Sequence, residues 1–262
     1  MNKILFLIVI ITSLAAGLPA AAGIQTKSID YRDGSTELQG YLVWDDNLKG
    51  KRPGVLVVHE WWGLNDYARQ RARQLAEAGY VAFALDMYGK GRVTKHPDQA
   101  STWMKQVQEN RDAWVRRATA GLAAFKKQSL VDTDRLAAIG YCFGGATVLN
   151  MAYAGVDLKA VVSFHGALPL PEEKQQKPIL ASILVAQGHD DPFVPSEQVA
   201  ALQAALAKTA ADWEVIVFGA TRHSFTNPDA ASYGMDALAY NPRADHRSWA
   251  MMLELFNEKF KQ

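Results

Sequence analysis

Short runs of apolar residues alternate along the chain with longer segments whose apolar positions recur at helical spacing. The run at 55–58 contains no polar residue, which is typical of a strand buried under helices on both faces of a sheet. Near the C-terminus, Trp249, Leu253, Phe256 and Phe260 share one helical face, so this helix should pack on the sheet. The alternation predicts an α/β fold with a mostly parallel central sheet flanked by helices on both faces. We expect strands over residues 38–44, 54–59, 80–86, 136–141, 160–165, 179–187 and 214–218, and helices over 67–77, 97–127, 144–154, 196–207 and 244–260.

The composition fits one globular domain. The 262 residues are 49% hydrophobic and 21% charged, which supplies a sizeable core. No repeat, low-complexity tract or linker divides the chain, and we expect 87–128 to be a loop followed by helix rather than a separate lid domain. The 28 basic and 27 acidic residues nearly balance, which argues against nucleic acid or an anionic membrane as a partner. We expect a monomer or a weak dimer.

The first 22 residues have the layout of a cleavable secretory signal. Lys3 precedes an apolar run at 4–11, and small residues follow up to Gly23. This run is shorter than the roughly 20 residues that a spanning helix needs, which favours cleavage over an uncleaved membrane anchor. We therefore expect a signal peptide over 1–22 and a single mature domain over 23–262. The protein would be exported, to the periplasm or as a secreted protein, with no membrane contact after cleavage.

The solitary cysteine, Cys142, is the strongest candidate for chemistry. A single cysteine excludes an internal disulfide, and structural cysteines of exported proteins usually come in pairs. Gly140 and Gly144 flank it in the G-x-nucleophile-x-G pattern of the α/β-hydrolase elbow, with cysteine in place of the usual serine. The elbow joins a predicted strand to a predicted helix, whose positive end favours a thiolate. Taken alone, the segment is also compatible with a buried structural cysteine.

Two later strand ends carry the partners that such a nucleophile requires. Asp191 follows the strand predicted over 179–187, and His223 follows the one over 214–218. Nucleophile, acid and histidine thus come in the order that α/β hydrolases use. The carboxylate of Asp191 can hold the His223 ring in one tautomer while the other ring nitrogen faces Cys142. A turn aspartate and a surface histidine would explain each segment singly, but the coincidence of three strand ends favours a triad.

Over essentially the whole mature chain, the sequence resembles the dienelactone hydrolases of the α/β-hydrolase superfamily. The resemblance is carried by VHEWWG at 58–63, DMYG at 86–89 and GYCFGG at 140–145, and by the segments at 191–192 and 223–225. It implies an α/β-hydrolase fold and a carboxylic ester or lactone hydrolase that forms a thioester acyl-enzyme and needs no cofactor. Its partner would be a small-molecule ester or lactone.

The resemblance also implies roles for individual residues. Cys142 would be the nucleophile, His223 the base and Asp191 the acid that orients it. The oxyanion hole would be formed by the backbone N–H groups of Trp61 and Phe143.

Glu60 would contact the resting thiol and help to set its protonation. The sequence itself also supports a functional role for Glu60, because a carboxylate at the tip of an apolar strand is costly to bury without a partner. His59 and Glu60 begin like the zinc motif H-E-x-x-H, but Gly63 stands where the second histidine would be, so we expect no metal site. His165 and His189, at other strand ends, are expected to be structural or rim residues.

The chain departs from the family at the positions that bind substrate. Dienelactone-active members hold the substrate carboxylate with two arginines, whereas Lys90 and Asn227 stand at these positions here. Lysine keeps the charge but loses the bidentate fork, so a small anionic lactone is not the expected natural substrate. Arg222 would substitute only if it points inward. The candidate substrate-binding residues are Lys90, Tyr88, Trp62, Arg222 and Phe225, of which the aromatic ones could equally belong to the core.

Two other classes of function stay open at this level. An exported Cys142 could act in thiol redox chemistry, although without a resolving cysteine any cycle would need an external thiol. A non-catalytic binding protein on the same fold is the other, because a fold alone does not establish activity.

Overall fold

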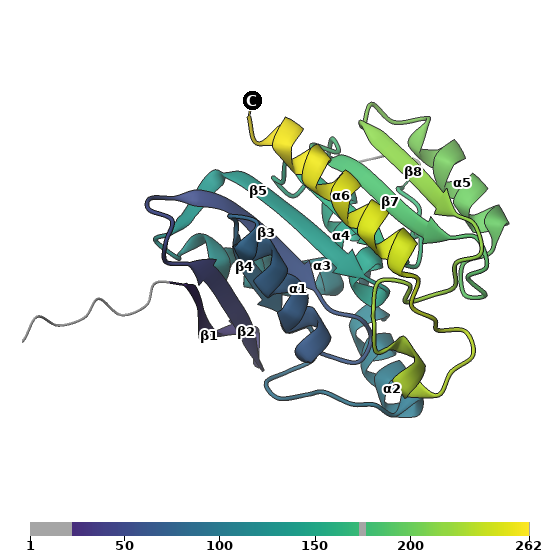
Figure 1. The fold of residues 1–262 in the computed structure, drawn as a ribbon, viewed down its shortest axis with the longest axis horizontal. Coiled ribbons are helices and arrows are strands. Elements are labelled where there is room, and N and C mark those ends of the chain that lie inside the picture. The colour runs from purple at the N-terminus through teal and green to yellow at the C-terminus, as the bar shows by residue number, and fades with distance from the viewer. Residues whose placement is uncertain (1–22, 173–176, 262) are drawn as a thin grey trace, which may run out of the picture.

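The computed structural model describes residues 23–172 and 177–261, and the predicted signal peptide at 1–22 lies outside them. These residues form one sheet covered by helices on both faces (Figure 1), which confirms the predicted α/β architecture. The strands are β1 (Ile24–Asp33), β2 (Thr36–Asp45), β3 (Arg52–Val58), β4 (Val81–Leu85), β5 (Val131–Tyr141), β6 (Ala160–Phe164), β7 (Ser182–Gly188) and β8 (Trp213–Phe218). Their order in the sheet is β1-β2-β4-β3-β5-β6-β7-β8. β2 is antiparallel to both of its neighbours, and all other pairs are parallel.

The helices follow the strands in the expected alternation. They are α1 (Asp66–Glu77), α2 (Pro97–Gln108), α3 (Arg111–Lys126), α4 (Phe143–Tyr153), α5 (Ser196–Leu206) and α6 (Pro242–Lys259), with a short 3₁₀ helix over Ala230–Tyr233. In the described ranges, no helix is both long and apolar enough to cross a membrane.

Two elements differ from the prediction. The single helix expected over 97–127 is two helices, because Asn110 has extended backbone and its side chain accepts a hydrogen bond from the N–H of Ala113 at 2.9 Å, which starts α3 afresh. β1 carries too few apolar residues to stand out in the sequence. It is an edge strand that forms a hairpin with β2, and most of its side chains are partly or fully exposed.

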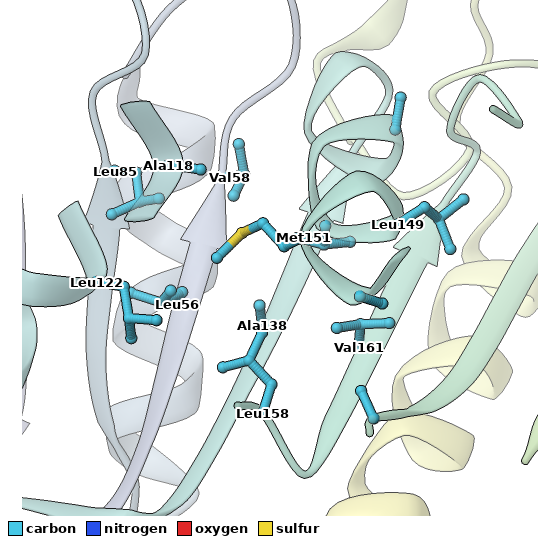
Figure 2. Close-up of a cluster of buried hydrophobic side chains, with 14 of the residues drawn as sticks. Leu56, Val58, Leu85, Ala118, Leu122, Ala138, Leu149, Met151, Leu158 and Val161 are labelled. Carbon is cyan, nitrogen blue, oxygen red and sulfur yellow. The ribbon is translucent and has the colours of Figure 1, made fainter. Parts of the chain in front are cut away.

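The sheet buries one layer of apolar side chains on each face. Leu56 and Val58 of β3 point to the face covered by α3, α4 and α5, and Figure 2 shows them in a cluster with Leu122 of α3 and Met151 of α4. The alternate residues of β3 point to the other face, which α1 and α6 cover. Because successive side chains of a strand point to opposite faces, a strand buried on both sides has no polar position. This explains the unbroken apolar runs in the sequence.

All functional candidates of the sequence analysis that follow parallel strands lie at one edge of the sheet. Glu60 follows β3, Cys142 follows β5, His165 follows β6, Asp191 follows β7 and His223 follows β8. Parallel strands present their carboxyl ends at the same edge, where ligands of open α/β sheets bind. The topology thus brings residues up to 163 positions apart in the sequence to one place.

Candidate active site

The nucleophile elbow is built by close backbone approach. Cys142 adopts the left-handed conformation with φ +54° and forms the N-cap of α4. A Cβ at Gly140 would lie 1.9 Å from the carbonyl oxygen of Gly144, and a Cβ at Gly144 would lie 2.2 Å from that of Val58. The N–H of Cys142 donates to the carbonyl of Phe164 on β6 at 3.0 Å. Only glycine fits at these two positions, and the strained turn holds the partly exposed thiol at the N-terminus of α4.

The side chains of His223 and Asp191 lie together beside Cys142. His223 Nδ1 and Asp191 Oδ2 are 2.7 Å apart, and both side chains are buried. The ring also hydrogen-bonds with Cys142, which leaves Nε2 for that contact. Two further donors fix the carboxylate: Gln187 Nε2 at 2.8 Å from Oδ2, and the N–H of Phe193 at 2.9 Å from Oδ1. The acid is therefore held on both oxygens before any substrate arrives.

The protonation of His223 follows from this neighbourhood. Burial alone would lower the pKa of the ring. The negative charge and hydrogen bond of Cys142, together with Asp191, outweigh burial and raise the pKa of His223 to about 10. The arrangement favours the protonated form of the His223 ring.

Glu60 is buried at this edge but engaged elsewhere than expected. Its Oε1 accepts from Ser224 Oγ at 2.5 Å and its Oε2 from Asn227 Nδ2 at 2.8 Å. Two donors of the segment after β8 thus engage both carboxylate oxygens, and within residues 23–172 and 177–261 no hydrogen bond joins Glu60 to Cys142. Burial raises the pKa of Glu60, and these two hydrogen bonds and the charge of His223 oppose the rise.

Two backbone N–H groups are available at the position expected for an oxyanion hole. Phe143 is the first residue of α4, directly after Cys142, and Trp61 follows Glu60 in the segment after β3. In the described part of the chain, neither N–H has a hydrogen-bond acceptor. Both residues line the same cavity as Cys142. A free N–H at a helix N-terminus is suited to bind a negatively charged oxygen.

A cavity of about 200 Å³ opens above the thiol and is walled mainly by apolar groups. Cys142 and His223 line it together with Trp61 and Phe143. The other wall residues come from α2 and from loops after β6, β7 and β8, and they are Met104, Gln108, Ala167, Phe193, Val194 and Leu238. Apart from Cys142 and His223, no ionisable side chain lines the cavity within the described residues.

None of the five candidate substrate-binding residues lines this cavity. Lys90 Nζ lies 3.1 Å from Asp30 Oδ2 at the surface, and the exposed Arg222 donates to the carbonyl of Asp236 at 2.8 Å. The three aromatic residues belong to the core. Trp62 stacks on Tyr233 with ring centroids 4.1 Å apart, Tyr88 packs edge-on against His59, and Phe225 packs against His165.

The other three histidines singled out in the sequence are separate from one another in the described part of the chain. His59 is buried and contacts the carbonyl of Glu60 and the N–H of Met87, and burial lowers its pKa. His165 is buried beside His223, whereas His189 is exposed. Among the described residues, no three His, Cys, Asp or Glu side chains gather as metal ligands would.

Three residues that build this site were not predicted from the sequence. Met104 and Gln108 lie one turn apart on α2 and therefore face the same way, but their spacing does not reveal that this side of α2 faces the thiol. Gln187 at the end of β7 holds Asp191, and a polar residue closing an apolar strand was the available signal.

A cysteine elbow, a histidine and an acid at the carboxyl edge of a mostly parallel sheet define an α/β hydrolase. The sequence matches the family description "Dienelactone hydrolase family" over residues 38–260. The chain belongs to the dienelactone hydrolase family, and it is a dienelactone hydrolase-like ester hydrolase.

Relatives and solved structures agree over almost the full length. A protein of Aquifex aeolicus, described as a candidate carboxymethylenebutenolidase, is 27% identical over 238 residues, which are 89% of this chain and 98% of the relative. The solved structure named m3DLH is 41% identical, with a TM-score of 0.87 over 90% of this chain and 99% of its own. A dienelactone hydrolase-like promiscuous phosphotriesterase from metagenomic libraries is also 41% identical, with a TM-score of 0.86 over the same shares of 90% and 99%.

Proposed function

We propose that this protein hydrolyses small uncharged esters and lactones through a Cys142–His223–Asp191 triad. The observation that carries the proposal is the continuous hydrogen-bonded line from Asp191 through His223 to the thiol, which lies at the floor of a cavity with two free N–H groups. Membership of the dienelactone hydrolase family favours hydrolysis over the redox and the non-catalytic interpretations.

In the proposed reaction, the thiolate of Cys142 attacks the substrate carbonyl carbon, and the N–H groups of Trp61 and Phe143 hold the resulting oxyanion. The intermediate collapses by expelling the alkoxide, which takes the proton of His223 as it leaves. His223 then removes a proton from water, the hydroxide attacks the thioester, and the sulfur departs as thiolate. The carboxylic acid is released and the resting pair is restored.

Sulfur and the cavity wall narrow the proposed substrates. A thiolate is itself a good leaving group, so an amide would mostly collapse back to reactants, whereas activated esters, enol esters and lactones go forward. The apolar wall offers no cation to a substrate carboxylate, and Lys90 is paired with Asp30 at the surface. We therefore expect uncharged acyl groups of a few carbons rather than an anionic dienelactone.

Burst kinetics with p-nitrophenyl acetate and a panel of lactones test the proposal. We expect rapid release of p-nitrophenolate equivalent to the enzyme, followed by steady turnover. Cys142→Ala should abolish both phases, and His223→Ala should reduce them steeply. Turnover that survives in Cys142→Ala would disprove the proposed nucleophile, and thiol-dependent peroxide consumption without ester turnover would favour redox chemistry instead.

A second activity is suggested by the similarity to a promiscuous phosphotriesterase. A neutral aryl dialkyl phosphate carries no charge that the apolar cavity would exclude. The thiolate would attack phosphorus and expel the aryloxide, and water activated by His223 would cleave the resulting phosphorothioate ester. Hydrolysis of such a triester that is lost in Cys142→Ala would support this activity, and its absence in an esterase-active preparation would exclude it.

A further inference from the structure

His165 lies directly behind the candidate base. Its ring centroid is 5.2 Å from that of His223 at an interplanar angle of 66°, and Phe193 contacts the same ring at 5.1 Å and 87°. The ring of His223 thus makes an edge-to-face contact with each of these two rings. Phe193 is half-exposed, whereas His165 has no exposed surface. The inner of the two contacts is therefore the rigid one.

The backbone of His165 is held in an uncommon conformation. Its φ is +40°, in the left-handed region that non-glycine residues seldom adopt. Its N–H donates to the carbonyl of Ala186 on β7 at 2.8 Å, while the preceding carbonyl, of Phe164, accepts from Cys142. The conformation directs the ring into the space beneath the triad and joins the ends of three strands. Strain of this kind persists where the surrounding structure enforces it.

A buried chain of polar groups fixes the ring from the far side. His165 Nε2 lies 2.7 Å from Thr226 Oγ1, which lies 2.5 Å from the hydroxyl of Tyr67. Arg71 Nε donates to that hydroxyl at 3.2 Å. Arg71 is itself buried, donates to the carbonyl of Thr226 and pairs with Asp245 on α6 at 2.6 Å.

The direction of this chain is set by the guanidinium, which can only donate. If Tyr67 accepts from Arg71 and donates to Thr226, then Thr226 donates to Nε2 of His165, and the ring proton is on Nδ1. This assignment leaves one polar group without a partner in the described residues, namely Nδ1. The reverse assignment would leave Nδ1 and the hydroxyl proton of Tyr67 unpaired. The assignment with the fewest unpaired groups therefore gives His165 the Nδ1–H tautomer, with Nε2 as the acceptor from Thr226.

The surroundings keep this ring neutral. Burial lowers the pKa of His165 well below its ordinary value, and the nearby charges of His223 and Arg71 act in the same direction. The titratable or charged groups that face the two histidines from the packed elements are Cys142, Asp191, Glu60, Tyr67, Arg71 and Tyr141. Cys142, Asp191 and Glu60 interact electrostatically with His223, and Arg71 with His165.

We propose that His165 is a positioning residue for the base: a neutral imidazole, fixed in one tautomer by Thr226, Tyr67 and Arg71, that holds the ring of His223 between Cys142 and Asp191 and excludes water from behind it. The proposal rests on the proposed function of His223. A base held in place needs no reorientation between acylation and deacylation, and a dry rear wall strengthens its attraction to the thiolate and the carboxylate.

Imidazole ¹⁵N NMR tests the proposal without any turnover. In the wild type, we expect His165 to show a bare Nε2 and a protonated Nδ1 that do not titrate between about pH 5 and 9. In Thr226→Val, which removes the hydroxyl at nearly constant volume, this signature should be lost and the His223 signals should move. Thr226→Ser keeps the hydroxyl and should retain both. A proton on Nε2, or a His165 that titrates in this range, would refute the proposal.

The pH dependence of kcat/KM is the second readout. His165→Asn tests the ring rather than the backbone, because asparagine tolerates positive φ. We expect kcat/KM to fall about ten- to a hundredfold in Thr226→Val and His165→Asn, as for other misplaced catalytic groups. The decrease of kcat/KM at alkaline pH, which we assign to loss of the His223 proton, should move to lower pH, because water reaches His223 and weakens its attraction to the thiolate and the carboxylate. His189→Asn, at an exposed strand end, is the matched control.

Three outcomes are distinguishable. An unmoved alkaline limb in both variants, with unchanged His223 signals, would mean that His165 is an ordinary core residue. If Thr226→Val does not fold, the wild-type spectrum and the pH profile of His165→Asn still decide whether His165 positions His223. A wild-type protein without esterase activity would overturn the proposed function, while the NMR experiment would still report whether His165 orders the ring of His223.

Discussion

The two sides of the cavity are built by different means. On the side of the base, Asp191, His223 and Glu60 are buried and every carboxylate oxygen accepts a hydrogen bond. On the opposite side, Met104 and Gln108 of α2 are partly exposed, and in the described ranges the Gln108 amide has no hydrogen bond. The reacting groups are preorganised, whereas the substrate-facing wall is held by apolar contacts. Changes on the first side should alter catalysis, and changes on the second should alter the choice of substrate.

Asp191→Asn should have the largest effect. The amide cannot support a positive His223 and can hold the wrong tautomer, so we expect kcat/KM for p-nitrophenyl acetate to fall about 10³–10⁴-fold. Asp190→Asn changes the exposed neighbouring residue in the same way and should leave the rate unchanged. Steady-state kinetics on both variants decide which aspartate belongs to the triad, and equal losses would contradict the assignment.

The wild-type pH profile should show the raised pKa of His223 directly. Since Cys142 and Asp191 raise that pKa to about 10, the imidazolium that protonates the leaving group persists up to that pH. We expect kcat/KM to rise as the thiolate–imidazolium pair forms and to fall about tenfold per pH unit once His223 loses its proton above pH 10. In contrast, deacylation needs neutral His223, and the acyl-enzyme lacks the thiolate charge, so kcat should reach its plateau at lower pH. A profile that is flat from acid to alkaline pH would exclude the pair.

Glu60→Gln should have an intermediate effect. The buried carboxylate and the positive His223 stabilise each other, so removing the charge should lower the pKa of His223 and move the alkaline limb of kcat/KM to lower pH. We expect kcat/KM to fall about 10- to 100-fold, as for other groups that support reacting residues. Asn227→Ala removes one hydrogen bond but keeps the charge, so it should shift the limb less. Equal shifts in both variants would show that the hydrogen bonds matter rather than the charge.

The contrast between buried and partly exposed regions also explains which parts of the fold and of the site could be predicted from the sequence. Strands buried on both faces lack polar positions, so the core strands were predictable to within a few residues, and the glycines and polar residues at their ends indicated Cys142, Asp191 and His223. β1 was not predictable from the apolar pattern, because an edge strand needs little burial. The contact of Glu60 with the thiol was implied by the family resemblance. Lys90 and Arg222 were considered in place of the family's two arginines, and the three aromatic candidates were inferred from their position beside the motifs. Where a side chain points after a turn depends on tertiary packing, and there Phe225 turns into the core while Phe193 reaches the cavity.

Gln108→Leu should have the smallest effect and should separate the two sides of the cavity most cleanly. Replacing the unpaired amide with an apolar side chain removes a polar group from the wall, so longer acyl chains should bind better. We expect kcat/KM for p-nitrophenyl butyrate relative to acetate to rise about three- to fivefold, the equivalent of roughly one buried methylene, with the alkaline limb unmoved. Gln106→Leu introduces the same change on an exposed position of α2 outside this cavity and should leave the ratio unchanged. A shifted pH profile in Gln108→Leu would mean that the wall also controls His223, and the division between a fixed catalytic side and an adaptable substrate side would be wrong.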